Sequence, residues 1–117
     1  MNLWPDALCI ADIDKAIEQY GFTDIDRGNL QGLANLNQPP VIGYRHFVDV
    51  VAWNKMAHDV VYDELKNGNF PILLGGDHCF GLASLTAVAR PSWEQGIPLR
   101  ILWLAAHADL TPSVLAP

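Results

Sequence analysis

Basic residues are scarce in this sequence, and they form no cluster. Lys and Arg together number 7 against 13 Asp and Glu, which gives a formal net charge of −6. Proteins that bind nucleic acid neutralise phosphates with clustered Lys and Arg side chains. The charge balance therefore excludes nucleic acid as an expected partner.

Long hydrophobic runs and paired cysteines are missing as well. The apolar runs are interrupted within about ten residues, whereas a membrane-spanning helix needs about 20. The first residues lack a basic leader and carry Asp6 and Asp12 early, unlike a signal peptide. Cys9 and Cys79 lie far apart without a CxxC pair, as is typical of reduced thiols. We therefore expect a cytoplasmic protein without membrane association.

The sequence is rich in apolar residues, and these recur at regular intervals. Half of the 117 residues are hydrophobic and 17% are charged, which is typical of one globular domain. Three- and four-residue spacing predicts helices, the last of them ended by Pro91, over residues 11–20, 45–67 and 80–89. Apolar runs bounded by turn residues predict strands over residues 22–26, 70–75 and 99–104. The Gly-, Asn- and Pro-rich residues 27–43 predict a long loop.

The alternation of strands and helices predicts an α/β fold. Strands connected through helices at these spacings form crossover units, and the strands then lie parallel in one sheet. Ligands of open α/β sheets gather beyond the carboxyl ends of the strands. Both strands at 70–75 and 99–104 are followed by polar residues, so we expect a functional site where these two strands end.

The polar residues after the two strands have a structural and a functional interpretation. Structurally, Gly75 and Gly76 form only a tight turn, Asp77 caps the following helix, and His78 packs in the core. Functionally, the residues form a metal site with His107 and Asp109, which are two apart and so point to the same side of an extended segment. Imidazole and carboxylate ligands suit Mn, Zn or Fe, and a carboxylate-rich set favours Mn.

A two-ion version of this site requires a carboxylate that both ions share. The natural position lies two residues before His107, on the same side of the segment. That position is Ala105, which cannot coordinate a metal.

The two motifs resemble those of the ureohydrolases, the arginase–agmatinase–formimidoylglutamase family. FPILLGGDHCFGLASLTAVAR is similar to the first metal motif, a Gly-Gly-Asp-His-Ser strand end that leads into a helix. LWLAAHADLTP is similar to the second, Asp-Ala-His-x-Asp followed by Asn-Thr-Pro, and DRGNL upstream is arginase-like. The resemblance implies a three-layer αβα fold with a parallel sheet, of which residues 1–117 are an N-terminal partial domain.

The resemblance also implies roles for individual residues. His78 and His107 match histidine ligands of the two manganese ions, and Asp109 matches a carboxylate on the first ion. Thr111 matches the start of the substrate loop. The residues that match as supports of the loop, without binding metal, are Gly75, Gly76 and Asp77. The implied reaction is hydrolysis of a guanidinium or amidine C–N bond in a small substrate.

Departures from the family pattern leave two functions open. Ala105 replaces the bridging aspartate, Leu110 stands near the usual asparagine, and the sequence given ends at Pro117, before the family's later motifs. The first function is an arginase-like hydrolase of which this chain is an N-terminal part, inactive alone. The second is a non-catalytic binding or interaction module that keeps the fold.

The remaining candidates are expected to be structural. We expect packing or surface roles for His46 and His58, and an inert thiol at Cys79. Open edges of a small parallel sheet recruit other strands, so we expect a homo-oligomer or a complementary chain. The side chains expected to become buried on association are Trp4, Trp53 and Trp93.

Overall fold

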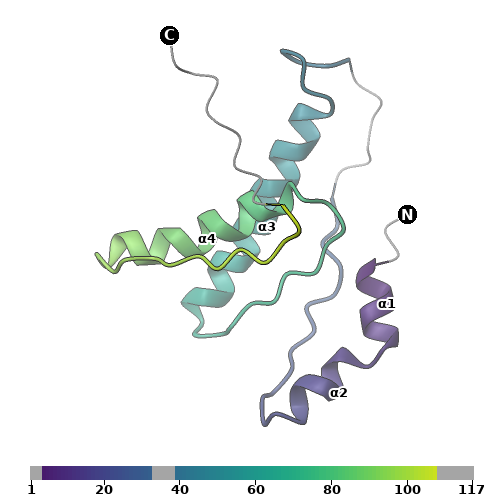
Figure 1. Cartoon of the computed structure of the whole chain (residues 1–117), viewed down its shortest axis with the longest axis vertical. Helices are drawn as coiled ribbons and strands as arrows, with labels where there is room; N and C mark the ends of the chain where they lie inside the picture. Colours follow the sequence, from purple (N-terminus) through teal and green to yellow (C-terminus); the bar gives the residue numbers. More distant parts are fainter. Residues whose placement is uncertain (1–3, 33–38, 108–117) are drawn as a thin grey trace.

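Four helices form the regular structure of residues 4–32 and 39–107, which are the residues that the computed structural model describes. They are α1 (Trp4–Ile10), α2 (Ile13–Glu18), α3 (Phe47–Lys66) and α4 (Phe80–Glu94). In Figure 1, α3 and α4 cross at the centre, and α1 and α2 lie apart from them on the other side of the segment that leads out of α2. The predicted helices at 11–20 and 45–67 are therefore confirmed, each slightly shorter than expected, and α1 is additional.

Helices α3 and α4 pack against each other mainly through small side chains. The buried residues of α3 follow one face of the helix at three- and four-residue steps: Asn54, Ala57 and Val61, preceded by Asp49. Those of α4 are Ala83 and Ala87, one turn apart. Alanine at the crossing lets the two backbones approach closely, and these side chains account for the buried apolar core of the described residues.

Both long helices end in the same motif, in which a glycine follows the last turn. After α3, Gly68 has φ +80°, its N–H donates to the Leu65 carbonyl at 3.1 Å, and the Asn69 N–H donates to the Glu64 carbonyl at 3.0 Å. After α4, Gly96 and Ile97 repeat this paired pattern, with Gly96 at φ +66°. This is the Schellman motif, which requires a left-handed residue after the helix. Each motif turns the chain back along its helix into an extended segment.

Pro91 does not end α4, contrary to the prediction of a helix over 80–89. The helix continues through Pro91 to Glu94. Proline lacks the N–H that would bond to the Ala87 carbonyl, but a helix can continue past that single lost bond. The hydroxyl of Ser92 donates to the Val88 carbonyl at 3.3 Å and adds a bond in the same turn.

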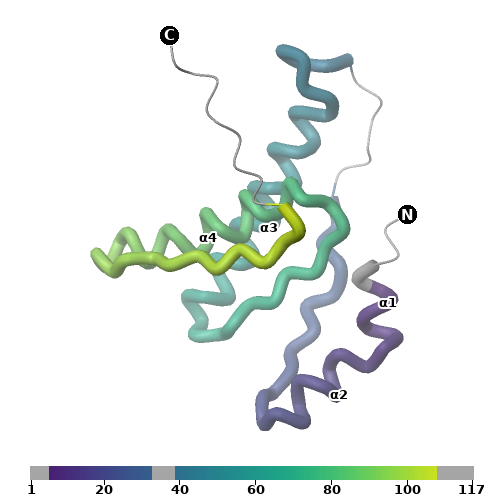
Figure 2. The backbone as a smooth tube through the Cα atoms, viewed as in Figure 1, coloured from purple at the N-terminus to yellow at the C-terminus, as the bar shows by residue number. Residues whose placement is uncertain are grey.

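The predicted strands are not formed in the described residues. Residues 70–75 and 99–104 are extended and run in the same general direction in Figure 2, but no backbone hydrogen bond joins them within the described part of the chain. Parallel strands are stable when apolar cover lies on both faces. Here Phe70, Leu102 and Leu104 remain 89%, 82% and 85% exposed, so that cover is incomplete. Residues 22–26 are likewise irregular, and Phe22 is exposed.

The segment after α2 is attached to α3 at two points. Arg27 pairs with Glu64, with Nε 2.8 Å from Oε1 and an NH2 nitrogen 3.2 Å from Oε2. Gly32 packs on the indole of Trp53 so closely that a Cβ at residue 32 would overlap the ring. The same segment bonds to α1, where Asn29 donates to Asp6 at 3.2 Å. Residues 22–32 thus connect the two helix pairs.

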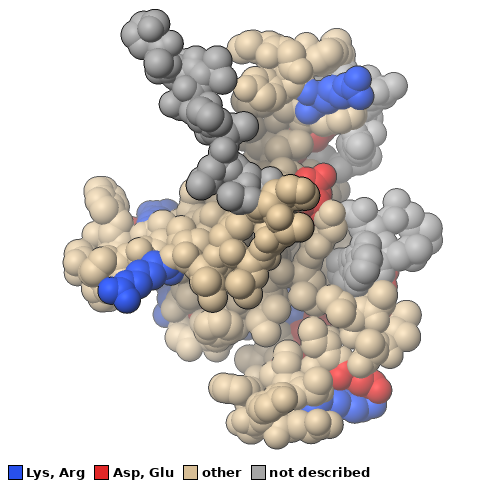
Figure 3. All heavy atoms as spheres, viewed as in Figure 1, with Lys and Arg blue, Asp and Glu red and all other residues tan. Residues whose placement is uncertain are grey.

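The molecule is less compact than a typical globular chain of the same length. Its radius of gyration is 16.6 Å, against about 13 Å for a compact chain of this size. In the view of Figure 3, the surface over α4 and the segment 97–104 carries few charged side chains. Large apolar side chains of this region, such as Trp93 at 83% and Leu104 at 85%, are exposed.

Candidate functional site

The ends of the two extended segments meet, as expected for the two polar motifs. They line one cavity of about 340 Å³, to which the first segment and α4 contribute Leu73, Gly75, Asp77, His78, Phe80, Gly81 and Ser84. The second segment contributes Leu102, Trp103, Leu104 and Ala105. The cavity therefore joins the first motif to the position where a shared carboxylate would stand. Asp109 and Thr111 lie outside the described residues, and His107 is exposed at the edge of them.

His78 is held against an aromatic ring from the second segment. The His78 and Trp103 ring centroids lie 5.3 Å apart, with the rings inclined by 78° in an edge-to-face arrangement. A Cβ added at Gly81 would lie 3.5 Å from the Trp103 ring, so the indole also covers the first turn of α4. Trp103 thus fixes the second segment beside His78.

Trp103 was missed as a site residue, although a signal was present. It lies two residues before Ala105 and four before His107, so the alternation of an extended segment predicts it on their side. It falls in the predicted strand over residues 99–104, and no site role was assigned to it. Its contact with His78 is the clearest link between the two motifs.

Asp77 shapes the turn that leads into α4. Its Oδ1 accepts a hydrogen bond from the Cys79 backbone N–H at 2.9 Å, which is the pattern of an Asx turn. This bond lowers the pKa of the Asp77 carboxyl below its ordinary value, because it stabilises the charged form. The side chain is therefore already engaged on one oxygen.

Cys79 follows His78 as the first residue before α4. Burial raises the pKa of its thiol, and the neighbouring Asp77 raises it further. A thiol with a raised pKa stays protonated at neutral pH and reacts slowly. This environment agrees with the expectation of an inert cysteine.

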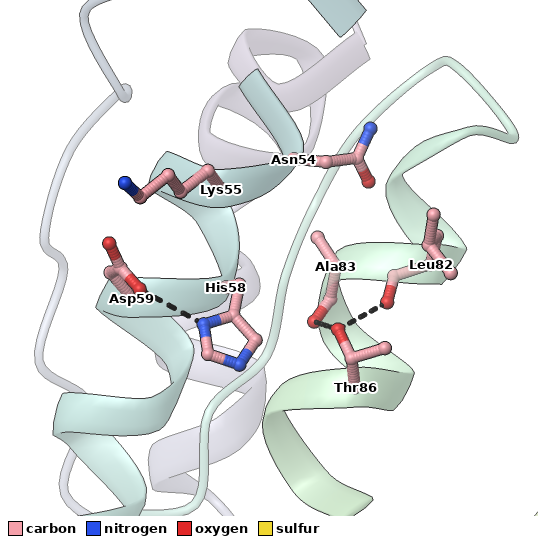
Figure 4. Close-up of a pocket in the computed structure, with 7 residues that line it drawn as sticks. All are labelled: Asn54, Lys55, His58, Asp59, Leu82, Ala83 and Thr86. Atoms are coloured by element: carbon pink, nitrogen blue, oxygen red, sulfur yellow. Dashed lines mark hydrogen bonds and ion pairs between the residues drawn. The ribbon is translucent and has the colours of Figure 1, made fainter. Parts of the chain in front are cut away.

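A second, shallower hollow of about 460 Å³ lies between α3 and α4 (Figure 4). His58 points from α3 towards α4 there, with its Nδ1 3.0 Å from Asp59 Oδ1, whereas Lys55 and Asp59 point away from α4. Across the hollow, the Thr86 hydroxyl donates to the Leu82 carbonyl at 2.7 Å. His58 also stacks on Tyr62, with centroids 6.0 Å apart. These groups bond to their own helices and do not converge on a common point.

His46 also has a structural position. It precedes the first residue of α3 with φ +52°, and its Nδ1 lies 3.8 Å from Asp49 Oδ2, beyond hydrogen-bond distance. His46 therefore lies at the start of α3, and His58 lies beside Asp59 and Tyr62 of its own helix.

The described residues do not fit a two-ion metal centre. Among residues 4–32 and 39–107, no three His, Cys, Asp or Glu side chains are grouped so that they could hold an ion. Of the described residues that line the cavity at the segment ends, His78 carries an imidazole and Asp77 a carboxylate, which accepts the Cys79 N–H. Ala105 offers a methyl group where the resemblance implies a carboxylate.

No helix within the described part of the chain is long and apolar enough to cross a membrane.

Comparisons with known proteins agree on one family. An arginase of Brucella melitensis biotype 1 is 36% identical over 112 residues, which cover 92% of this chain and 35% of the relative. An arginase of Brevibacillus brevis is 28% identical over 117 residues, covering the whole chain and 38% of the relative. An arginase of Staphylococcus aureus strain MSSA476 is 25% identical over 113 residues, covering 94% of the chain and 36% of the relative. No solved structure gives a significant match.

The chain therefore spans a little over a third of the length of these relatives. The sequence profile of the Arginase family matches residues 5–116, which is nearly the whole chain. The chain therefore belongs to the arginase family over nearly its whole length.

Proposed function

We propose that this chain takes part in arginase-type hydrolysis, the cleavage of a guanidinium or amidine C–N bond in a small substrate, as one part of a larger unit. In this proposal His78, His107 and Asp109 contribute to a manganese centre whose other ligands come from further residues. Thr111 belongs to the substrate loop, and Gly75, Gly76 and Asp77 support the metal-binding turn. Residues 1–117 are then a partial domain that is inactive alone.

The observation that carries this proposal is the shared cavity at the segment ends. His78 of the first motif and residues 103–105 of the second line the same space, although about 25 residues of chain lie between them. Membership of the arginase family implies an α/β fold, and we propose that residues 70–75 and 99–104 become adjacent parallel strands of a three-layer αβα sheet in the complete unit. Their common direction and their meeting ends support this arrangement.

A non-catalytic interaction module is the second candidate. The specific observation in its favour is Ala105, which lines the cavity with a methyl group where a shared carboxylate would be needed. In both cases we propose that the chain associates, as a homo-oligomer or with a complementary chain, and that it resides in the cytoplasm. The free thiols of Cys9 and Cys79 suit a reducing compartment.

Urea release distinguishes the two candidates. The chain is assayed with Mn²⁺ and arginine or agmatine, alone and after co-expression with the part of the Brevibacillus brevis arginase that it does not match. Intact relative serves as the positive control, and circular dichroism shows that each variant folds. We expect no urea from the chain alone.

Urea release that appears on co-expression and is lost in His78→Ala would support the hydrolase. Co-purification of the two polypeptides without urea release would support the interaction module. Turnover by the 117-residue chain alone would contradict the proposed dependence on further residues.

A further inference from the structure

An aromatic side chain holds the turn between the first extended segment and α4, which is the GGDHC turn at residues 75–79. Phe80, the first residue of α4, lines the cavity at the segment ends. A Cβ added at Gly75 would lie 3.4 Å from the Phe80 ring, so the ring covers the backbone where the GGDHC turn begins. Phe80 therefore contacts the first residue of this turn and follows directly after its last one.

Trp53 of α3 supports the Phe80 ring. The two ring centroids lie 6.2 Å apart and the rings are inclined by 88°, which is an edge-to-face contact. The indole also packs against the backbone of Gly32. Both rings are half-buried within this chain. An unbroken series of contacts thus leads to the GGDHC turn from the segment after α2: Gly32, Trp53, Phe80 and Gly75.

A second aromatic contact joins α3 to α4 further along both helices. The Arg90 guanidinium lies over the Tyr62 ring, with Cζ 4.5 Å from the centroid, and the Tyr62 hydroxyl donates to Glu94 at 3.3 Å. Tyr62 is half-buried, as Trp53 is. It is not among the described residues that line the cavity, and its partners lie towards the other end of α4 from Phe80. Tyr62 is therefore a matched comparison, an aromatic residue of α3 that packs on α4 away from the GGDHC turn.

We infer that Trp53 is a positioning residue, which through Phe80 holds the GGDHC turn in the orientation that a metal centre at this turn needs. The inference rests on the proposed function in assigning this turn to the manganese centre. A metal site is precise when packing behind its ligands fixes them, and substitution of such supporting groups costs roughly 10- to 100-fold in metal affinity or activity. In this inference Trp53 supports the turn from behind and takes no part at the reacting atoms.

Cys79, the last residue of the GGDHC turn, reports how firmly the turn is held in the chain alone. It is partly buried, whereas Cys9 is exposed, so its modification by N-ethylmaleimide relative to Cys9 measures opening of the turn within one molecule. The variants are Trp53→Leu, which removes the edge-to-face contact, Trp53→Phe, which retains an aromatic ring, and Tyr62→Leu as the matched control. Mass spectrometry distinguishes the two cysteines.

We expect Trp53→Leu to speed the relative modification of Cys79 about threefold to tenfold, the effect of losing one aromatic pair on a local opening. Trp53→Phe and Tyr62→Leu should leave the rate close to that of the unsubstituted chain. Circular dichroism shows that each variant folds, and Phe80→Leu, which removes the same contact from the other side, replaces Trp53→Leu if that variant does not.

The metal requirement is measured in the chain co-expressed with the remaining part of the relative. Trp53→Leu should raise the Mn²⁺ concentration for half-maximal urea release on the order of tenfold, and Tyr62→Leu should not. An unchanged Cys79 rate in Trp53→Leu, or equal effects of Trp53→Leu and Tyr62→Leu in either measurement, would overturn the inference. Absence of urea with the unsubstituted chain would instead contradict the proposed hydrolysis, and the Cys79 rates would then decide the inference alone.

Discussion

Among the described glycines, Gly32 leaves the least space for a side chain. Its backbone lies against the indole of Trp53, where any Cβ would overlap the ring. Trp53 in turn makes an edge-to-face contact with Phe80, at 6.2 Å between centroids, so a displaced indole would disturb α4 as well. The close approach depends on the missing side chain.

We predict that Gly32→Ala lowers the free energy of unfolding by about 1–3 kcal/mol, the usual cost of overpacking. Chemical denaturation followed by circular dichroism measures this change. Trp53→Leu in the same chain should recover part of the loss, because it removes the overlapping ring. A loss that is the same with and without Trp53 would show that the steric explanation is wrong.

Asp77 gives the stability a dependence on pH. Hydrogen bonding to the Cys79 N–H lowers the pKa of Asp77 in the folded chain, so the unfolded chain binds a proton at higher pH than the folded one. The stabilisation is therefore complete above the ordinary aspartate pKa of about 3.9 and is lost as the pH falls below it. Because Asp77 is exposed, the effect is small.

Asp77→Asn tests this, since an amide oxygen still accepts the hydrogen bond but does not titrate. We expect the free energies of unfolding of the two chains to differ most at about pH 6, and the difference to shrink as the pH falls below the ordinary aspartate pKa of about 3.9. A constant difference across this range would mean that the carboxyl has the same pKa in both states.

At the scale of elements, the helices were predictable and the sheet was not. The apolar spacing and Gly68 predicted helix α3 correctly, because the hydrogen bonds and the C-cap that stabilise a helix are local in sequence. The predicted end of α4 was wrong. Proline disfavours helix at the preceding residue and removes one helical hydrogen bond, but Arg90 is helical nonetheless and the helix continues to Glu94. Helices and their caps can therefore be predicted from residues that are close in sequence.

Whether a strand forms depends on the residues that cover its faces, and the local sequence does not show which residues these are. Residues 70–75 and 99–104 are apolar enough for buried strands, yet their backbones are unpaired in the described part of the chain and Ile72 and Ile101 remain 57% and 54% exposed. The site shows the same division. The motifs predicted that His78, His107 and Asp109 lie together. His78 lines the cavity with Ala105 but His107 does not, and Asp109 lies outside the described residues. The Trp103 contact depends on how the two segments pack.

Over the whole molecule, exposed apolar surface predicts association. Phe70, Trp93 and Leu104 are each more than four-fifths exposed, at 89%, 83% and 85%. Burying about 400 Å² of such surface contributes on the order of 10 kcal/mol. We expect sedimentation at micromolar concentration to give species heavier than the 12.9 kDa chain.

Substitution of one exposed side chain locates the contact. Leu104→Lys should shift the sedimentation profile towards the monomer, whereas Ile10→Lys on α1, equally exposed at 83%, should not. A folded monomer at all micromolar concentrations would contradict the expected association. The side chain of Trp4, which was also expected to become buried on association, lies outside the described ones.

The crossing of α3 and α4 through alanine has a consequence for how the chain exchanges its amide hydrogens with solvent. Ala57, Ala83 and Ala87 bury little area each, so the crossing opens at a modest free-energy cost, and both helices lose their protection in one event. Within the described part of the chain, no backbone hydrogen bond protects the amides of the two extended segments. We therefore expect deuterium to enter residues 70–75 and 99–104 of the chain alone faster than the helices, and more slowly if the proposed sheet forms with another polypeptide.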